Sequence, residues 1–321
     1  MTARVVTLGE PLIGLVATDA GPLSGANLFA RFVVGAESNL AIGLARLGVP
    51  VALIGRVGLD PLGDAVLREL RAEGVDVSGL SRDDEGATGV LIRGRRGFGP
   101  SEVFYQRSGS AGSRLDGADV KSATSLIEDA EWLHLTGITP LLSDASAEAV
   151  RAAVAIASAA GTKISVDVNL RRKLWHDGAR ELLDELLAQA NLVLSGTDEL
   201  VFVTGVESEE AAVKSLQSDS ARDVEVVLKR GARGATAFVG SRVVHAPARP
   251  VSQVLDVVGA GDAFAAGYLL GLLEASPVEQ RLETANACGA FAVTALGDAV
   301  GLPSRAELDV ALRHSDDEVI R

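Results

Sequence analysis

Short hydrophobic runs and stretches of helical periodicity alternate along most of the chain. Apolar runs of strand length predict strands at residues 4–9, 51–58, 132–137, 163–168 and 192–195. Apolar positions that recur at helical spacing predict helices at residues 37–47, 62–73, 144–160 and 178–190. Because strands and helices alternate, the pattern predicts an α/β fold with a mainly parallel sheet flanked by helices. We expect a single domain over residues 1–321.

Two segments interrupt this alternation, at residues 11–34 and 87–108. Both contain short strand-like runs joined by glycine-rich turns. We expect them to leave the main sheet and to form a small β-strand lid whose apolar face makes a dimer contact. Two surface hairpins without such a role are the alternative.

Composition narrows the class of ligand. The 321 residues carry a net charge of -13, which repels nucleic acids and anionic membranes and favours a small-molecule ligand. No apolar run reaches the roughly 18 residues that a membrane span needs, so we expect a cytoplasmic protein. Cys288 is the single cysteine, which excludes an intramolecular disulfide, and the four histidines are too scattered for a zinc site. Any metal is expected to arrive with a substrate.

The stretch "DVVGAGDAFAAGYL" at residues 256–269 is the strongest candidate for chemistry. Two glycines precede a predicted helix, whose first N–H groups can bind a phosphate that the glycines allow to approach. The N–H groups of Ala260, Gly261 and Asp262 could stabilise a transferring phosphoryl group while the Asp262 carboxylate takes a proton from the attacking hydroxyl. Alternatively, Asp262 only complements the helix dipole and Gly259 and Gly261 only make a turn.

Other nucleotide-binding patterns fit less well. The glycines at 259–261 open a late helix and lack the third glycine of a dinucleotide fingerprint, which disfavours an oxidoreductase, and no Walker-type Gly-Lys-Ser/Thr end is present. Residues 226–239 read as a strand, a basic turn and a second strand. Lys229, Arg230 and Arg233 in this segment could face nucleotide phosphates or simply be solvated.

Two long motifs together resemble a known family. "VVGAESNLAIGLARLGVPVALIGRVGLDPLGD" and "DVVGAGDAFAAGYLLG" resemble the paired signatures of the ribokinase-like, or PfkB, carbohydrate kinases. The resemblance covers almost the whole chain and implies the family's three-layer α/β fold with a β-strand lid. "GEPLIGL", "FYQRSGSAGS", "LHLTGITPLLS", "DVNLRRKLW" and "LKRGARGA" are most similar to the 2-keto-3-deoxygluconate kinases of this family.

This resemblance implies transfer of the ATP γ-phosphate to a terminal hydroxyl, here O6 of 2-keto-3-deoxygluconate, with magnesium neutralising the phosphates. It makes Asp262 the base and Gly259, Ala260 and Gly261 the anion hole. The implied sugar contacts are Gly35, Asn39, Tyr105, Arg107 and Arg171. Two arginines suit a ligand with a carboxylate, which a guanidinium binds through two hydrogen bonds. Each contact also has a purely structural reading: surface ion pairs for the arginines, a buried dimer contact for Tyr105 and a helix cap for Asn39.

For the nucleotide, the resemblance implies a second set of contacts. These are Lys229, Gly231, Gly234, Asn286, Cys288 and Gly289. It also implies that Glu199 orders magnesium-bound water, although an exposed first-turn carboxylate would look the same. Tight packing of a small-residue helix would equally explain residues 286–289. The expected assembly is a homodimer through the lid or a higher homo-oligomer, and the need for a monovalent cation stays open.

Four positions depart from the family pattern: Val34, Leu91, Gly196 and Val257. Leu91 matters most, because the matching lid position in 2-keto-3-deoxygluconate kinases is often a tyrosine that touches the sugar acid. The alternative acceptors are therefore fructose, ribose or another keto-deoxy acid. A sugar-sensing relative without turnover is the alternative from another class, although Asp262 and both neighbouring glycines are present.

Overall fold

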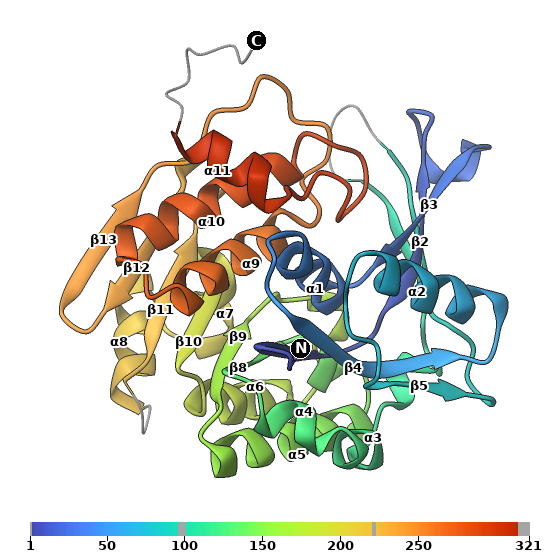
Figure 1. The fold of residues 1–321 in the computed structure, drawn as a ribbon, viewed down its shortest axis with the longest axis horizontal. Helices are drawn as coiled ribbons and strands as arrows, with labels where there is room; N and C mark the ends of the chain where they lie inside the picture. Colours follow the sequence, from blue (N-terminus) through green and yellow to red (C-terminus); the bar gives the residue numbers. More distant parts are fainter. Residues whose placement is uncertain (1, 96–100, 220–222, 314–321) are drawn as a thin grey trace.

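The computed structural model describes residues 2–95, 101–219 and 223–313, which form a three-layer α/β fold around one large sheet (Figure 1). The strand order in this sheet is β13 (Arg242–Ala246), β12 (Ala235–Val239), β11 (Glu225–Lys229), β10 (Leu192–Gly196), β9 (Lys163–Asp167), β8 (Trp132–Thr136), β1 (Val5–Leu8), β4 (Val51–Gly58) and β5 (Leu80–Asp83). Pairing is parallel from β11 to β5, and β12 and β13 add an antiparallel edge. The predicted fold class is confirmed.

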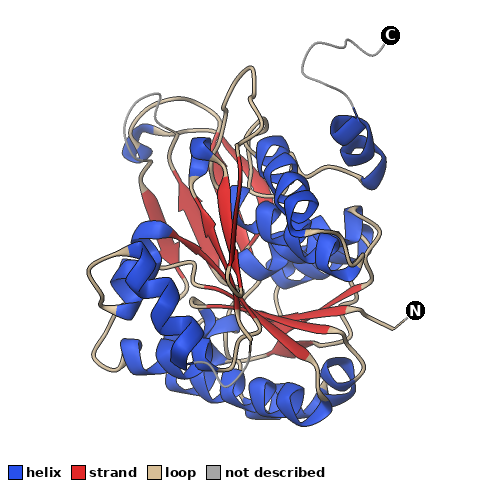
Figure 2. Cartoon of the chain, turned by 90° about the vertical axis from the view of Figure 1, so that its left-hand side faces the viewer, coloured by secondary structure: helices blue, strands red, loops and turns tan. Residues whose placement is uncertain are grey.

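Helices cover both faces of the sheet, as Figure 2 shows. One layer contains α1 (Ala36–Arg46), α2 (Pro61–Ala72), α9 (Ala260–Leu273), α10 (Val278–Ala292) and α11 (Arg305–Arg313). The other contains α3 (Gly117–Ser122), α4 (Thr124–Glu128), α5 (Asp144–Ala160), α6 (Ala179–Ala188), α7 (Thr197–Thr204) and α8 (Glu209–Asp219). Each layer packs its apolar side chains against the sheet and so makes its own hydrophobic core.

Long, strongly periodic elements form where the sequence predicts them. Strand β4 and helix α5 match their predicted ranges. Residues next to α5 in the sequence explain where this helix begins and where it ends. Ser143 caps its first turn by accepting the Ser146 N–H, and Gly161 takes the left-handed conformation just after its last residue. Similarly, α1 ends at Arg46, Leu47 caps it, and Gly48 follows with a φ of 81°.

Several short elements were not predicted from the sequence. They are β5, β13, α3, α4, α8 and α11. Strand β5, for example, has only four residues, "LSRD", and two of them are charged, so it carries no apolar run. Such elements are stabilised by the sheet edge or helix layer that they join rather than by their own pattern.

The two interrupting segments form a second, four-stranded sheet beside the main one. Its strand order is β3 (Phe29–Val34), β2 (Leu12–Ala17), β6 (Val90–Arg93) and β7 (Val103–Gln106), and we call it the small sheet. Residues 96–100 of the predicted segment 87–108 lie outside the described residues. Val34, one of the four departures from the family pattern that the sequence resembles, packs over Gly14, where a Cβ would lie 2.8 Å from the Val34 side chain. No helix in the described part of the chain is long and apolar enough to cross a bilayer.

Candidate active site

A cavity of about 920 Å³ lies between the carboxyl edge of the main sheet and the small sheet. Successive parallel strands deliver residues to it: Glu10 follows β1, Ile138 follows β8, Asn169 follows β9 and Lys229 ends β11. The strands β4 and β8 lie on opposite sides of β1, so the chain direction across the sheet reverses here. Open α/β sheets characteristically bind ligands at such a reversal.

The start of α9 forms one wall of this cavity. Gly259 precedes the helix with a φ of 84°, and a Cβ at this position would lie 2.1 Å from the Asp298 carbonyl oxygen. A glycine is therefore needed both for the backbone conformation and for the close approach of the two chain segments. Asp262 lies in the first turn of α9, as predicted, and Gly259, Gly261 and Asp262 line the cavity.

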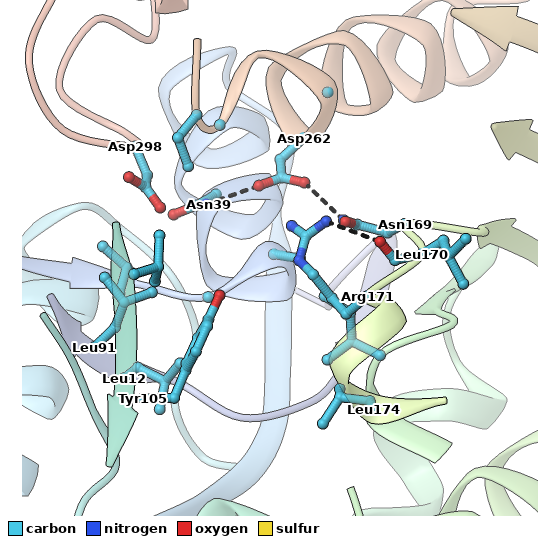
Figure 3. A pocket seen from close by; sticks show the side chains of 18 of the residues that line it. Leu12, Asn39, Leu91, Tyr105, Asn169, Leu170, Arg171, Leu174, Asp262 and Asp298 are labelled. Carbon is cyan, nitrogen blue, oxygen red and sulfur yellow. Dashed lines mark hydrogen bonds between the residues drawn. The ribbon is translucent and has the colours of Figure 1, made fainter. Parts of the chain in front are cut away.

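Two amides hold the Asp262 carboxylate in place. Asn39 Nδ2 on α1 donates to Asp262 Oδ2 at 2.7 Å, and Asn169 Nδ2 donates to Oδ1 at 3.3 Å (Figure 3). Burial raises the pKa of Asp262 to about 7, against the Asn39 hydrogen bond, which favours the charged form. The pKa of about 7 is the net result, because nearby Asp167 also favours the protonated acid, whereas Lys229 and Arg171 favour the carboxylate. The carboxylate is thus poised to take up or release a proton near neutral pH.

A buried ion pair lies beside this carboxylate. Lys229 Nζ donates to both oxygens of Asp167, at 2.6 and 2.9 Å, and Asp167 is almost fully buried. Burial lowers the pKa of Lys229, but the carboxylates of Asp167, Glu199 and Asp262 outweigh this effect and the net shift is upward. The amine lies 3.2 Å from the point where a Cβ on Gly261 would be, so a fixed positive charge lies beside the first turn of α9.

Glu199 uses both of its oxygens in local hydrogen bonds. Oε2 accepts the Gly196 N–H at 2.8 Å and Oε1 accepts the Leu170 N–H at 3.1 Å. Among the described residues, no group of three or more acidic, histidine or cysteine side chains could hold a metal ion. The role expected for Glu199, ordering water on a magnesium ion, therefore stays a prediction.

The residues predicted to contact the sugar all line the cavity: Gly35, Asn39, Tyr105, Arg107 and Arg171. The two arginines differ in their partners. Arg107 Nε donates to the buried Glu10 carboxylate at 2.7 Å, and a second bond joins the same pair. Within the described part of the chain, Arg171 makes one hydrogen bond, to the Leu170 carbonyl at 3.5 Å, and Figure 3 shows its guanidinium beside Asp262 and Asn169. Arg171 is therefore the better candidate to bind an anionic group.

An apolar wall closes the cavity on the side of the small sheet. Leu12, Val34 and Leu91 pack together there with Tyr105. Leu91, the departure that bears most on the choice of substrate, thus lines the cavity with a side chain that cannot hydrogen-bond. Val257, another departure, also lines the cavity, two residues before Gly259.

Several residues predicted to bind the nucleotide lie outside this cavity. Gly231 and Gly234 are in the turn between β11 and β12, with Arg233 beside them and Arg230 paired with Glu209. Asn286, Cys288 and Gly289 lie on α10, which packs on α9. Asn286 donates to the carbonyls of Ala246 and Pro247 at 3.2 and 3.0 Å, and Cys288 is buried. Ala260 begins α9 without lining the cavity.

Sequence reasoning missed several polar residues that the structure brings to the site. They are Glu10, Glu37, Arg93, Asp167, Asn169 and Asp298. Asp167 and Asn169 had a usable signal, because they occupy the end of the buried strand "KISVDVN", where the carboxyl edge of a parallel sheet collects ligand-binding groups. The other four have no local signal.

Comparison with known proteins decides the family. A model of the pfkB family carbohydrate kinases matches residues 2–305 of the chain. The chain belongs to this family. This PfkB kinase is 35% identical to the 2-dehydro-3-deoxygluconokinase of Bacillus subtilis, over 96% of this chain and 95% of the relative. It is 37% identical to the enzyme of the same name from Thermoproteus tenax, over 96% and 94%.

Other relatives of this PfkB kinase carry a different substrate name. A Salmonella typhimurium fructokinase is 32% identical over 96% of this chain and 99% of the relative. A structure described as a putative Ribokinase II from E. coli in complex with ATP and magnesium superposes with a TM-score of 0.90 at 29% identity, covering 97% of this chain and all of that one. The predicted family and fold are confirmed, and the protein is an ATP-dependent carbohydrate kinase.

Proposed function

We propose that this PfkB kinase transfers the γ-phosphate of ATP to O6 of 2-keto-3-deoxygluconate and so makes 2-keto-3-deoxy-6-phosphogluconate. The observation that carries the choice of a sugar acid is Arg171. Its guanidinium lies beside Asp262 in the cavity, and among the described residues no carboxylate forms an ion pair with it. A guanidinium in this position suits a substrate carboxylate, with which it can form two parallel hydrogen bonds.

The proposed reaction uses Asp262 as the general base. Its carboxylate takes the proton of the attacking hydroxyl, and a pKa of about 7 suits this role at neutral pH. The N–H groups of Ala260, Gly261 and Asp262 stabilise negative charge on the transferring phosphoryl group, and Lys229 adds a positive charge beside them. Magnesium, bound with the nucleotide, supplies further neutralisation of phosphate charge.

The remaining contacts belong to the same proposal. Gly35, Asn39 and Tyr105 contact the sugar, and Glu199 orders water on the metal. Asn286 and Gly289, with the turn containing Gly231 and Gly234, border the nucleotide outside the described cavity. We also propose one domain over residues 1–321, a cytoplasmic location and a homodimer through the small sheet; a monovalent cation remains an open part of the proposal.

A neutral ketohexose such as fructose is the second candidate. Two observations favour it: the Arg107 charge is already matched by Glu10, and Leu91 offers the sugar no hydrogen bond. The fructokinase relative adds weight to this candidate. The two candidate substrates differ in charge, so a substitution of Arg171 should affect binding of the sugar acid but not binding of the neutral ketohexose.

The test measures ATP-dependent phosphorylation of 2-keto-3-deoxygluconate, other keto-deoxy acids, fructose and ribose, with Arg171→Ala as the variant. We expect the highest kcat/KM for 2-keto-3-deoxygluconate. The variant should raise its KM about 10- to 100-fold, as expected for loss of a charged hydrogen bond, and leave the KM for fructose nearly unchanged.

Arg172→Ala is the matched control, because Arg172 also lines the cavity but its guanidinium lies 4.7 Å from the Phe202 ring centroid. Arg172→Ala should keep the wild-type preference for 2-keto-3-deoxygluconate over fructose. A higher kcat/KM for fructose than for any sugar acid, or equal effects of Arg171→Ala on both substrates, would contradict the proposal.

A further inference from the structure

Arg93, the last residue of β6, places a buried guanidinium between the small sheet and the loops around α9. Its side chain is 6% exposed. Nη1 donates to Asp256 Oδ1 at 2.6 Å, Nη2 donates to the other oxygen of the same carboxylate, and Nη2 lies 3.3 Å from Asp298 Oδ1. One arginine from the small sheet therefore bridges two carboxylates that are 42 positions apart in the sequence, from Asp256 to Asp298.

Both carboxylates belong to the segments that shape the turn at Gly259. Asp256 accepts the N–H of Val258 at 3.1 Å and the N–H of Gly297 at 3.2 Å, so it joins the two loops directly. The backbone of Asp298 in turn packs so closely on Gly259 that a Cβ there would lie 2.1 Å from its carbonyl oxygen. The position of the Gly259 turn thus depends on the same pair of loops that Arg93 holds.

The strand that carries Arg93 also faces the proposed sugar position. Leu91, two residues earlier on β6, lines the cavity and pairs in the sheet with Tyr105 on β7. Because residues two apart in a strand project from the same face, Leu91 and Arg93 project from one face of the small sheet. A sugar that contacts this face therefore acts on the same rigid strand that contacts the loops before α9.

We propose that Arg93 is a positioning residue that couples sugar binding on the small sheet to the geometry of the anion hole at Gly259–Gly261. The guanidinium places one positive charge between two buried carboxylates and so offsets part of their negative charge beside the site that must receive a phosphoryl group. Without it, Asp256 and Asp298 repel each other and the incoming phosphate, and the Gly259 turn loses its tie to the small sheet. The inference rests on the proposed role of this turn as the anion hole.

An arginine is required because the contact with Asp256 uses two parallel hydrogen bonds. A lysine supplies the same charge from a single nitrogen, so it cannot form the two parallel hydrogen bonds that the planar Arg93 guanidinium makes with Asp256. Arg93→Lys therefore tests geometry, whereas Arg93→Met tests charge and geometry together. The double variant Arg93→Met with Asp256→Asn also removes the carboxylate that makes two hydrogen bonds with Arg93, so it lowers the cost of the lost cation and separates loss of coupling from failure to fold.

The experiment measures the affinity of the kinase for a non-hydrolysable ATP analogue with magnesium by calorimetry, with and without a saturating sugar. The sugar is whichever acceptor gives the highest kcat/KM in the panel above, so a preference for fructose leaves this test intact. In the wild type, we expect the sugar to tighten analogue binding about tenfold. Arg93→Lys, Arg93→Met and the double variant should abolish this tightening and lower kcat about 10- to 100-fold.

Arg31→Met is the matched control. Arg31 on β3 also ties the small sheet to the main body, through Glu69 on α2, but this ion pair lies at the surface away from α9. The control should keep both the coupling and kcat. Absence of coupling in the wild type, or coupling and kcat at wild-type levels in folded Arg93 variants that differ only in thermal stability, would overturn the proposal.

Discussion

At the residue scale, the environment of Asp262 sets its chemistry through opposing effects. Burial and the neighbouring Asp167 favour the protonated acid, whereas the Asn39 amide, Lys229 and Arg171 favour the carboxylate. The balance places the pKa at about 7, well above that of a solvated aspartate. A carboxyl group with such a pKa is a much stronger base than an ordinary aspartate, and about half of it is ionised at pH 7.

This balance predicts the pH dependence of the kinase. Asp262 can act as a base only when it is ionised, so kcat/KM should fall as the pH drops below about 7. Asn39→Ala removes a 2.7 Å hydrogen bond that stabilises the ionised form, so the pKa of Asp262 should rise. The acidic limb of the pH profile of kcat/KM, where the rate falls with decreasing pH, should then move about one unit to higher pH. Initial-rate measurements between about pH 5 and about pH 9 would show both the acidic limb in the wild type and its shift in Asn39→Ala.

Asp262→Asn is the control for this assignment. It should lower turnover by about two to four orders of magnitude. It should also remove the acidic limb of the pH profile, because the residual rate no longer depends on ionisation of the side chain at position 262. An acidic limb that stays in place in Asn39→Ala, or near-normal turnover in Asp262→Asn, would mean that another group is the base.

At the scale of elements, the first turn of α9 places two glycines in different surroundings. Gly259 has a positive φ and lies against the Asp298 carbonyl. Gly261 has an ordinary helical backbone, and the nearest neighbour of an added Cβ would be the Lys229 amine at 3.2 Å. One glycine is therefore needed to build the turn, and the other keeps space open in the cavity.

Alanine substitutions should separate these two roles. Gly259→Ala should lower the free energy of unfolding by about 1–3 kcal/mol, because the backbone must leave its left-handed conformation and move from Asp298. Gly261→Ala should leave the free energy of unfolding within about 1 kcal/mol of wild type, but should raise the KM for ATP and lower kcat by placing a methyl group against the phosphates. Urea denaturation and steady-state kinetics would measure the two effects.

The two variants serve as controls for each other. If Gly259→Ala is as stable as the wild type, the turn does not need the positive φ. If Gly261→Ala keeps wild-type kinetics, phosphate does not approach this part of the helix.

At the scale of the whole molecule, the small sheet has two faces of different character. Leu12, Val34, Leu91 and Tyr105 lie on the face towards the cavity. Phe104 is 53% exposed on β7, next to Tyr105, so strand alternation turns it to the opposite face. Phe29, the first residue of β3, and Leu28 just before it are also exposed. Exposed aromatic and aliphatic groups on one sheet favour the proposed dimer contact.

This arrangement predicts the oligomeric state. Light scattering should give a dimer for the wild type, and Phe104→Ser should weaken the dimer by about tenfold or more, as expected for truncation of an aromatic anchor. Val243→Ser is the control, since Val243 is 65% exposed on β13 at the far edge of the main sheet. A wild-type monomer, or equal effects of the two variants, would contradict the dimer through the small sheet.

The sequence by itself determined the elements and the motifs whose causes are local. The main strands and helices follow from apolar spacing, and Asp262 could be placed on the first turn of a helix because Gly259 and Gly261 precede it directly. Residue types in the two long motifs also indicated the family. The match between predicted and observed α5 shows how far periodicity and caps suffice for a long helix.

Only the tertiary structure decided which distant residues share the site. Asn39 and Asn169 meet Asp262 from α1 and from the end of β9, Arg107 is held by Glu10, and Arg93 reaches Asp256 across 163 positions. Periodicity reports which face of an element is buried but carries no information on the partner of a particular polar group. Those partners are set by strand order and by the fold of the small sheet onto the carboxyl edge, which bring together segments that no local pattern connects.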